Sequence, residues 1–329
     1  MKFCLLSTDP YHPEHGKDYT AEQNNMNLWA TIMGGTVYNG PLFDQGRYGL
    51  GYDYFNKFDL VMVALRQETI EVGIKVKKRS KVKVVVFLDS EVDYFTTYTT
   101  RDLQVKMVEL LNIADAVAVL HDESIPFFKA LTNKPVDVVG APYPIKRVRE
   151  MCPPAQKRKE IVLGSSIRSI LTHNRNALVN LAALSGTGLP GVVNIWEPVE
   201  MEYVQSIRKF LPIPFISFRS LKSGWNHFIT QVNYSLLGLH LDYRYSWGRF
   251  PIDCAAVGTP CVGSPSLYTQ KILFPRLCVP YHDIGGAVAL LKKLMSDAEF
   301  FDEAVTYAQS QIERFSSEQC KMRLLNLIS

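Results

Sequence analysis

The sequence predicts an α/β protein with two successive parallel sheets whose strands alternate with helices. Short apolar runs alternate with amphipathic helical patterns along most of the chain, and this alternation is typical of parallel α/β folds. Prolines at 142, 144, 153 and 154 and the basic stretch KRVREMCPPAQKRK interrupt it, which predicts a linker. A second alternating series starts afresh at Glu160. A chain of 329 residues is long enough for two such domains.

The first series begins at the N-terminus and contains buried-type strands with helices between them. In the expected helix 100–114, Leu103, Met107, Leu110 and Leu111 share one side, as an amphipathic helix requires. Gly34 and Gly35 stop the first helix. The expected strands are Lys2–Ser7, Asp59–Leu65, Lys81–Leu88, Ala116–Leu120 and Val136–Val139, and the expected helices are Thr20–Met33, Glu68–Lys78 and Thr100–Ala114.

The second series has the same character and ends in an almost wholly helical segment from Glu299 onward. We expect domains at residues 1–150 and 151–310, and a C-terminal helix at 311–329 that crosses back to the first domain. The expected strands are Glu160–Gly164, Val192–Trp196, Phe215–Phe218, Leu236–Leu241, Thr259–Ser264 and Cys278–Pro280, and the expected helices are Asn176–Leu184, Glu200–Phe210, Trp225–Tyr234, Phe250–Val257 and Gly285–Met295.

Composition excludes several classes of protein. Hydrophobic residues make up 47% and charged residues 21%, which is ordinary for a globular protein, and no apolar run approaches the ~18 residues of a spanning helix. The six cysteines show no C-x-x-C spacing, so we expect reduced thiols in the cytoplasm. The net charge of +4 is too small to indicate a nucleic-acid partner.

One stretch, residues 245–264, carries the strongest functional signal; it reads YSWGRFPIDCAAVGTPCVGS. A small-residue turn ending in Gly248 opens a helix that Gly258 ends. The first turn of such a helix presents free backbone N–H groups and a positive dipole end, which suit a phosphate. Asp253, farther along, could accept hydrogen bonds from ribose hydroxyls, or could pair with a donor inside its own domain.

This stretch resembles the donor-binding signature of GT-B glycosyltransferases, especially the retaining family-4 group. Asp253 stands where that family has its second Glu, which holds the ribose, whereas Tyr245 replaces the first Glu. The loop after residue 263 lacks the family's paired glycines. The residues that fall on the signature are Trp247, Gly248, Ala256, Gly258, Pro260 and Val262.

The resemblance implies two Rossmann-like domains facing across a cleft, with an acceptor-side first domain and a second domain that binds the nucleotide sugar. The expected catalytic residues are Asp89, His121 and Tyr245. The expected donor-binding residues are Gly16, Ser165, Arg168, Arg175, Arg219, Tyr245, Trp247, Gly248, Arg249 and Asp253. Several have a plainer interpretation: Asp89 and His121 as helix caps or surface residues, and Arg168 and Arg175 as surface arginines that cap a loop.

The expected activity is transfer of a sugar from a UDP- or GDP-linked donor to a glycan, lipid or protein acceptor, with retention of anomeric configuration. We expect no bound cofactor and no metal, because His12, Glu14 and His15 form one loop without a second cluster. The alternatives are a sugar-nucleotide 2-epimerase-like enzyme and an inactive GT-B module that binds a partner or sugar nucleotide. The basic run 75–83 would contact the inner face of a membrane, or is a solvated helix end.

Overall fold

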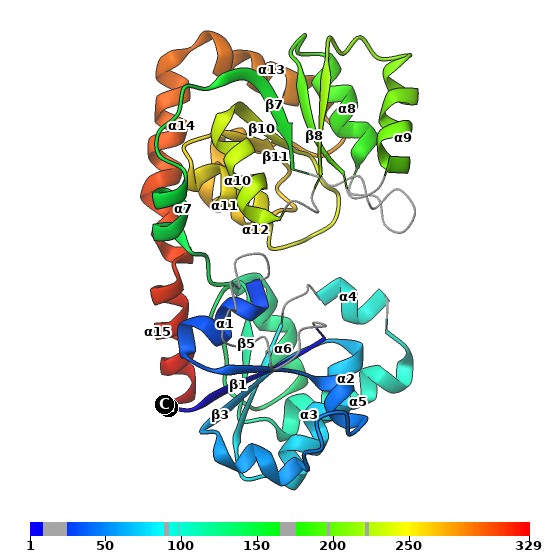
Figure 1. Ribbon diagram of the computed structural model, residues 1–329, viewed down its shortest axis with the longest axis vertical. Helices are drawn as coiled ribbons and strands as arrows, with labels where there is room; N and C mark the ends of the chain where they lie inside the picture. Colours follow the sequence, from blue (N-terminus) through cyan, green and yellow to red (C-terminus); the bar gives the residue numbers. More distant parts are fainter. Residues whose placement is uncertain (9–24, 89–91, 98, 165–175, 196–197, 221–223) are drawn as a thin grey trace. The chain divides into compact units, whose positions relative to one another are not determined.

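The computed structural model describes residues 1–8, 25–88, 92–97, 99–164, 176–195, 198–220 and 224–329 (Figure 1). The chain divides into two compact units. The first comprises Met1–Pro144 and Arg314–Ser329, and the second comprises Ile145–Glu313. Whether these units are independently folding domains with limits at 150 and 310 stays a prediction.

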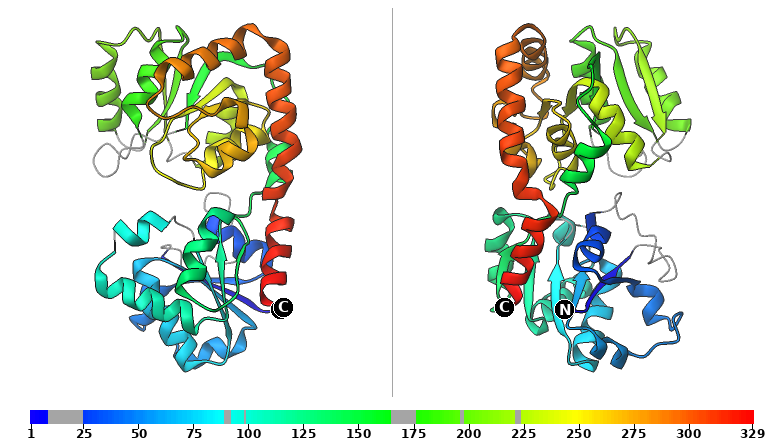
Figure 2. Two further views of the ribbon diagram at one scale, coloured as in Figure 1. Left: turned by 180° about the vertical axis from the view of Figure 1, so that it is seen from behind. Right: turned by 60° about the vertical axis from the view of Figure 1, so that its left-hand side comes forward.

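The first unit is built on a six-stranded parallel sheet with the order β2-β1-β3-β4-β5-β6. The inner strand β3 is apolar along its whole length because helices cover both faces of the sheet (Figure 2). The strands are β1 (Phe3–Ser7), β2 (Thr36–Asn39), β3 (Leu60–Ala64), β4 (Lys83–Phe87), β5 (Ala116–Val119) and β6 (Val136–Val138).

The helices of the first unit include the last one in the chain. This helix, α15, packs on α1, β5 and β6, and Lys321 Nζ donates to the Ile32 carbonyl at 2.8 Å. The N-cap Thr100 accepts a hydrogen bond from the Leu103 N–H at the start of α5. The helices are α1 (Asn25–Met33), α2 (Gly40–Asp44), α3 (Gln67–Arg79), α4 (Val92–Thr97), α5 (Arg101–Ile113), α6 (Ile125–Leu131) and α15 (Ser317–Ile328).

The second unit contains a five-stranded parallel sheet with the order β11-β10-β7-β8-β9. Its strands are β7 (Arg158–Leu163), β8 (Gly191–Ile195), β9 (Ile216–Ser220), β10 (Ser235–His240) and β11 (Cys261–Gly263). Its helices are α7 (Ile145–Met151), α8 (Ala177–Ser185), α9 (Pro198–Arg208), α10 (Trp225–Tyr234), α11 (Arg249–Ala256), α12 (Tyr268–Leu273), α13 (Ile284–Ser296) and α14 (Ala298–Gln311).

In both sheets the first strand of the unit lies inside the sheet and the strand order reverses beside it. The carboxyl ends of parallel strands at such a reversal point are where open α/β sheets bind their ligands. The predicted fold class is confirmed, because each unit has its own parallel sheet with interleaved helices.

Two predicted features are wrong. The segment Cys278–Pro280 forms no strand, and only Cys278 makes an isolated bridge, to Gly263. The supposed linker contains helix α7, whose Ile145 and Val148 are buried and which packs on α10 and α11. The prolines that suggested a linker flank this helix rather than interrupt it, so they are compatible with it.

Candidate functional site

The candidate site lies at the carboxyl end of the second sheet, where β10 leads into α11. Gly248 is the N-cap of α11 and has a positive φ of 80°. A Cβ atom at this position would lie 2.9 Å from Thr269 Oγ1, so both the backbone conformation and the space require glycine. Gly248 has no side chain that could cap this helix end, and Arg249, the first helical residue, follows directly. The N–H groups of Arg249 and Phe250 are therefore suited to an anion, whereas Pro251, the third residue of the helix, has no N–H.

The start of α12, directly after the loop that follows β11, is hydrogen-bonded to the turn that precedes α11. The Tyr268 N–H donates to the Ser246 carbonyl at 2.9 Å, and the Thr269 N–H donates to the Trp247 carbonyl at 3.0 Å. The rings of Trp247 and Tyr268 stack with centroids 5.6 Å apart and planes at 15°. These contacts hold the start of α12 against the turn that precedes α11, with the Trp247 and Tyr268 rings stacked between them.

Tyr245, at the position of the family's first Glu, lies beside a cation. Lys271 Nζ lies 5.3 Å from the centre of the Tyr245 ring and 5.6 Å from the centre of the Tyr268 ring. A cation over an aromatic face is attracted by the ring quadrupole. The structure therefore places a positive charge between two aromatic rings at this position.

Asp253 is buried in α11, with 2% of its surface exposed, and is paired inside the second unit. The Trp225 indole N–H donates to Asp253 Oδ1 at 3.1 Å. Arg249 Nε lies 4.0 Å from the same oxygen, and the Arg249 guanidinium lies 4.9 Å from the Trp225 ring centre. This network offsets the cost of burying a carboxylate. A role of Asp253 toward a ribose stays a prediction.

A buried His–Asp pair, which the sequence analysis missed, follows at the end of β10. His240 Nε2 lies 3.8 Å from Asp242 Oδ2, and the two residues are 3% and 0% exposed. Asp242 Oδ1 accepts from the Arg244 N–H at 3.0 Å, and the Asp242 N–H donates to Ser264 Oγ at 2.9 Å. The sequence signal for this pair is faint: two polar residues that flank Leu241 at the end of an apolar strand.

Gly164, at the end of β7, is a glycine for a packing reason. A Cβ atom there would lie 2.2 Å from Cδ1 of Phe250, in the first turn of α11. The Phe250 ring also meets the His240 ring edge-on, with centroids 5.7 Å apart. The space next to the Gly164 backbone is thus filled by the Phe250 side chain of the protein itself.

Lys157 supports the opposite end of α11. Its Nζ donates to the carbonyls of Asn233 and Val257 at 2.7 and 3.1 Å and to Thr259 Oγ1 at 2.8 Å. Burial lowers the pKa of the Lys157 ammonium to about 8. Through its three hydrogen bonds, the Lys157 side chain links the C-terminal ends of α10 and α11.

Comparison with known proteins identifies the fold but no sequence family. No protein-family model matches the chain, and no curated protein matches it. HepE from Anabaena in complex with UDP-glucose is 12% identical, with a TM-score of 0.72 over 99% of this chain and 98% of that one. Sucrose-phosphate synthase from Thermosynechococcus elongatus is 11% identical, with a TM-score of 0.74 over the same shares.

A third structure, described as trehalose-6-phosphate from E. coli bound with UDP-2-fluoro glucose, is 10% identical. It has a TM-score of 0.71 over 100% of this chain and 99% of that one. The chain has the GT-B fold. The resemblance carried by residues 245–264 is confirmed at the level of the fold. At 10–13% identity the likeness does not extend to activity or substrate.

Within this GT-B frame the structure brings together five predicted residues on one loop and helix of the second unit: Tyr245, Trp247, Gly248, Arg249 and Asp253. Arg219 lies apart from them on β9, where its Nε donates to Gln231 Oε1 at 3.2 Å. His121 lies in the first unit, after β5; it is buried, and its Nε2 is 3.3 Å from Ser124 Oγ. The remaining predicted residues lie outside the described residues: Gly16, Asp89, Ser165, Arg168 and Arg175.

Within the part of the GT-B chain that the structure describes, no group of three or more His, Cys, Asp or Glu side chains could hold a metal ion. In the same residues, no helix is long and apolar enough to cross a membrane.

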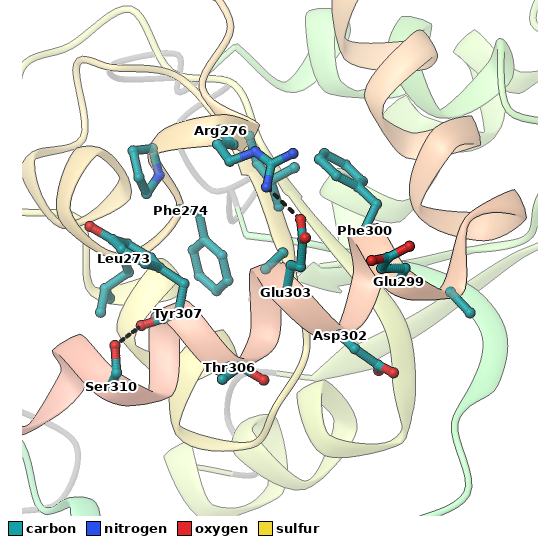
Figure 3. Close-up of a pocket in the computed structure, with 14 residues that line it drawn as sticks. Leu273, Phe274, Arg276, Glu299, Phe300, Asp302, Glu303, Thr306, Tyr307 and Ser310 are labelled. Atoms are coloured by element: carbon teal, nitrogen blue, oxygen red, sulfur yellow. Dashed lines mark hydrogen bonds and ion pairs between the residues drawn. The ribbon is translucent and has the colours of Figure 1, made fainter.

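A separate pocket of about 980 Å³ lies in the second unit, between the turn that carries Phe274 and Arg276 and helix α14 (Figure 3). Arg276 and Glu303 form an ion pair of 2.5 Å at its edge. Its apolar floor includes Phe274, Leu277 and Phe300, which are themselves 2%, 1% and 6% exposed. None of the residues that line this pocket is a predicted site residue.

Proposed function

We propose that this GT-B protein is a glycosyltransferase that takes a sugar from a nucleotide-activated donor and passes it to an acceptor hydroxyl, with retention of anomeric configuration. The observation that carries the proposal is the uncapped N-terminus of α11, framed by Gly248 and Arg249, at the carboxyl end of the second sheet. The neighbouring structure of HepE is a complex with UDP-glucose in one case and with UDP in another, which supports a nucleotide-sugar donor.

In the proposed complex, the donor diphosphate lies at the first turn of α11. The Arg249 guanidinium, partly exposed, adds positive charge there. Asp253 accepts hydrogen bonds from the ribose hydroxyls while it keeps its bond from Trp225. Trp225 thus holds the side chains of Arg249 and Asp253 in place before any ligand arrives. Such preorganisation lowers the free-energy cost of binding.

The proposed reaction needs no enzyme nucleophile. The bond between the anomeric carbon and the phosphate oxygen breaks while the acceptor oxygen bonds to the same carbon on the same face. The acceptor proton passes to an oxygen of the leaving diphosphate. The protein's part is to orient both substrates and to stabilise the charge that develops on the leaving group.

A second candidate function is a GT-B module that binds a sugar nucleotide without turnover. Lys271 beside Tyr245 favours it, because a carboxylate at that position is part of the resembled signature and a cation has the opposite charge. The loop after β11 also lacks the paired glycines of that signature, and Tyr268, which follows this loop, stacks on Trp247. No comparable observation favours the 2-epimerase alternative.

A thermal-shift panel of nucleotides and nucleotide sugars, followed by product analysis with the stabilising donor, tests the proposal. A ligand present at about 100 times its Kd stabilises the folded state by about 2.7 kcal/mol, so selective stabilisation reveals the base. Transfer to an acceptor, or slow hydrolysis of the donor with retained configuration, supports the transferase. Binding without any turnover supports the module, and an epimerised sugar nucleotide supports the epimerase. No stabilisation by any nucleotide contradicts the proposed function.

A further inference from the structure

We propose that the second unit binds the surface of an anionic lipid membrane through the amino ends of its strands. The surface concerned, here called the amino-edge surface, consists of Arg158, Lys159, Lys209, Phe210, Phe215 and Tyr234. It lies at the opposite ends of the parallel strands from the candidate site, so the proposal is independent of the donor and of the proposed transfer.

Two phenylalanine rings in the loop between α9 and β9 are turned to solvent. Phe210 is 85% exposed and Phe215 is 57% exposed. Single exposed apolar residues are common, but two large rings within one short loop are a feature of interaction surfaces.

The loop that carries these rings is held in one conformation by hydrogen bonds. Arg208 donates from its guanidinium to the carbonyls of Ile213 and Pro214, at 3.3 and 2.8 Å. Pro212 and Pro214 restrict the backbone further. The rings are therefore displayed by an ordered loop, so little conformational entropy is lost when they are buried.

Strand register brings the other members to the same edge. The Gly191 N–H at the start of β8 donates to the Phe215 carbonyl at 2.9 Å, and Gly191 is in register with Ile161 of β7. Arg158, the first residue of β7, is paired with Ser235 of β10, which follows Tyr234. The amino ends of β7 and β10 thus carry Arg158, Lys159 and Tyr234, and the loop before β9, two strands from β7, carries the exposed phenylalanines and Lys209.

The charge of this surface matches an anionic membrane. Arg158, Lys159 and Lys209 are exposed, and the Arg158 guanidinium lies 5.1 Å from the centre of the Tyr234 ring, which is 37% exposed. Basic residues attract anionic headgroups, and aromatic rings insert at the boundary between headgroups and acyl chains. A membrane offers both features at once, whereas an acidic protein would also need a pocket that matches Phe210.

The basic run of the first unit is a weaker candidate for the same role, because three of its lysines have acidic partners. Lys75 pairs with Asp44 at 2.7 Å, and Lys78 pairs with Glu109 at 2.5 Å. These pairs reduce the positive field of that run. It therefore supplies a matched control for charge.

The test is co-sedimentation of the full chain with vesicles of phosphatidylcholine alone and with about 30% phosphatidylserine added, at about 0.15 M salt. We expect binding to the anionic vesicles only. Phe210→Ala should lower the partition coefficient at least about tenfold, because a buried phenylalanine is a major apolar contribution. Val105→Ala, on α5 and 69% exposed in the wild type, should leave it unchanged.

The charge is tested by the double variant Lys159→Glu with Lys209→Glu, which should also lose binding, and by Lys75→Glu with Lys78→Glu, which should retain most of it. All replaced side chains are exposed or partly exposed, so circular dichroism should show intact folds. Absence of binding by the wild type overturns the proposal. Equal binding by Phe210→Ala and wild type overturns it too, as does a Phe210-dependent dimer in analytical ultracentrifugation without vesicle binding.

Discussion

Replacing Asp253 with alanine is expected to destabilise the second unit by about 2–4 kcal/mol. The hydrogen bond from Trp225 to this ionised acceptor contributes about 1.5–3 kcal/mol, and leaving the buried indole N–H without an acceptor costs about 1–3 kcal/mol. The contact with Arg249 at 4.0 Å, whose side chain is 21% exposed, adds at most about 1 kcal/mol. These contributions overlap, so their simple sum overestimates the effect.

Asparagine at position 253 separates the structural role from the ligand role. Its amide oxygen can accept the hydrogen bond from Trp225, so the loss of stability should be about 1 kcal/mol or less. The negative charge and one acceptor oxygen are lost, so affinity for the nucleotide should fall about tenfold if Asp253 holds the ribose. Asp302→Ala, an exposed position on α14, is the matched control and should change neither quantity.

Urea unfolding followed by tryptophan fluorescence measures the stability of the three variants, and calorimetric titration with the nucleotide measures affinity. An alanine variant within about 0.5 kcal/mol of wild type would refute the structural role of the Trp225–Asp253 bond. An asparagine variant with wild-type affinity would refute the ribose role and leave Asp253 as a structural carboxylate only.

The remaining predictions concern the frame of the site and its charge. Folding lowers the pKa of Lys157 from 10.5 to about 8, so between these pH values the unfolded chain binds a proton at Lys157 and the folded chain does not. The stability of the wild type relative to Lys157→Met should therefore rise with pH between about pH 8 and 10.5. A fall in this relative stability would mean that the three acceptors favour the ammonium. Gly164→Ala should cost about 1–3 kcal/mol in urea unfolding through overlap with Phe250, and Phe250→Leu should restore part of this loss; a neutral Gly164→Ala contradicts the packing. Arg168→Ala or Arg175→Ala should weaken UDP binding by at least about 1 kcal/mol in calorimetry. If both variants bind UDP with wild-type affinity, neither arginine contacts the donor and both are surface residues.

The fold could be predicted because its signals are local. The expected helix 225–234 has the bounds of α10, since an apolar stripe and a preceding glycine mark it in the sequence. Gly258 was expected to end α11 in a left-handed conformation, and its φ is 65°. Helix α7 was missed because its basic residues and neighbouring prolines have the composition of a linker, whereas burial of Ile145 and Val148 decides its structure.

The site could be predicted only in outline, because its chemistry depends on contacts between distant residues. The spacing of residues 247–262 predicted the loop and helix of the candidate site, but not what surrounds Asp253. Its hydrogen-bond donor, Trp225, is 28 residues away in the sequence. Likewise, a tyrosine in place of a glutamate is only a departure from a pattern until Lys271 is seen beside it.

The central claim, that a nucleotide sugar binds at the start of α11, is tested most directly by saturation-transfer NMR with a mixture of UDP- and GDP-linked sugars. The wild type should transfer saturation to one of them, and Arg249→Ala should lose this transfer. Arg276→Ala, the control, should retain it. Like the guanidinium of Arg249, the guanidinium of Arg276 lies 4.9 Å from the centre of an aromatic ring and near a carboxylate, but Arg276 lies at the pocket beside α14. No transfer to any nucleotide sugar, or equal transfer by wild type and Arg249→Ala, would contradict the claim.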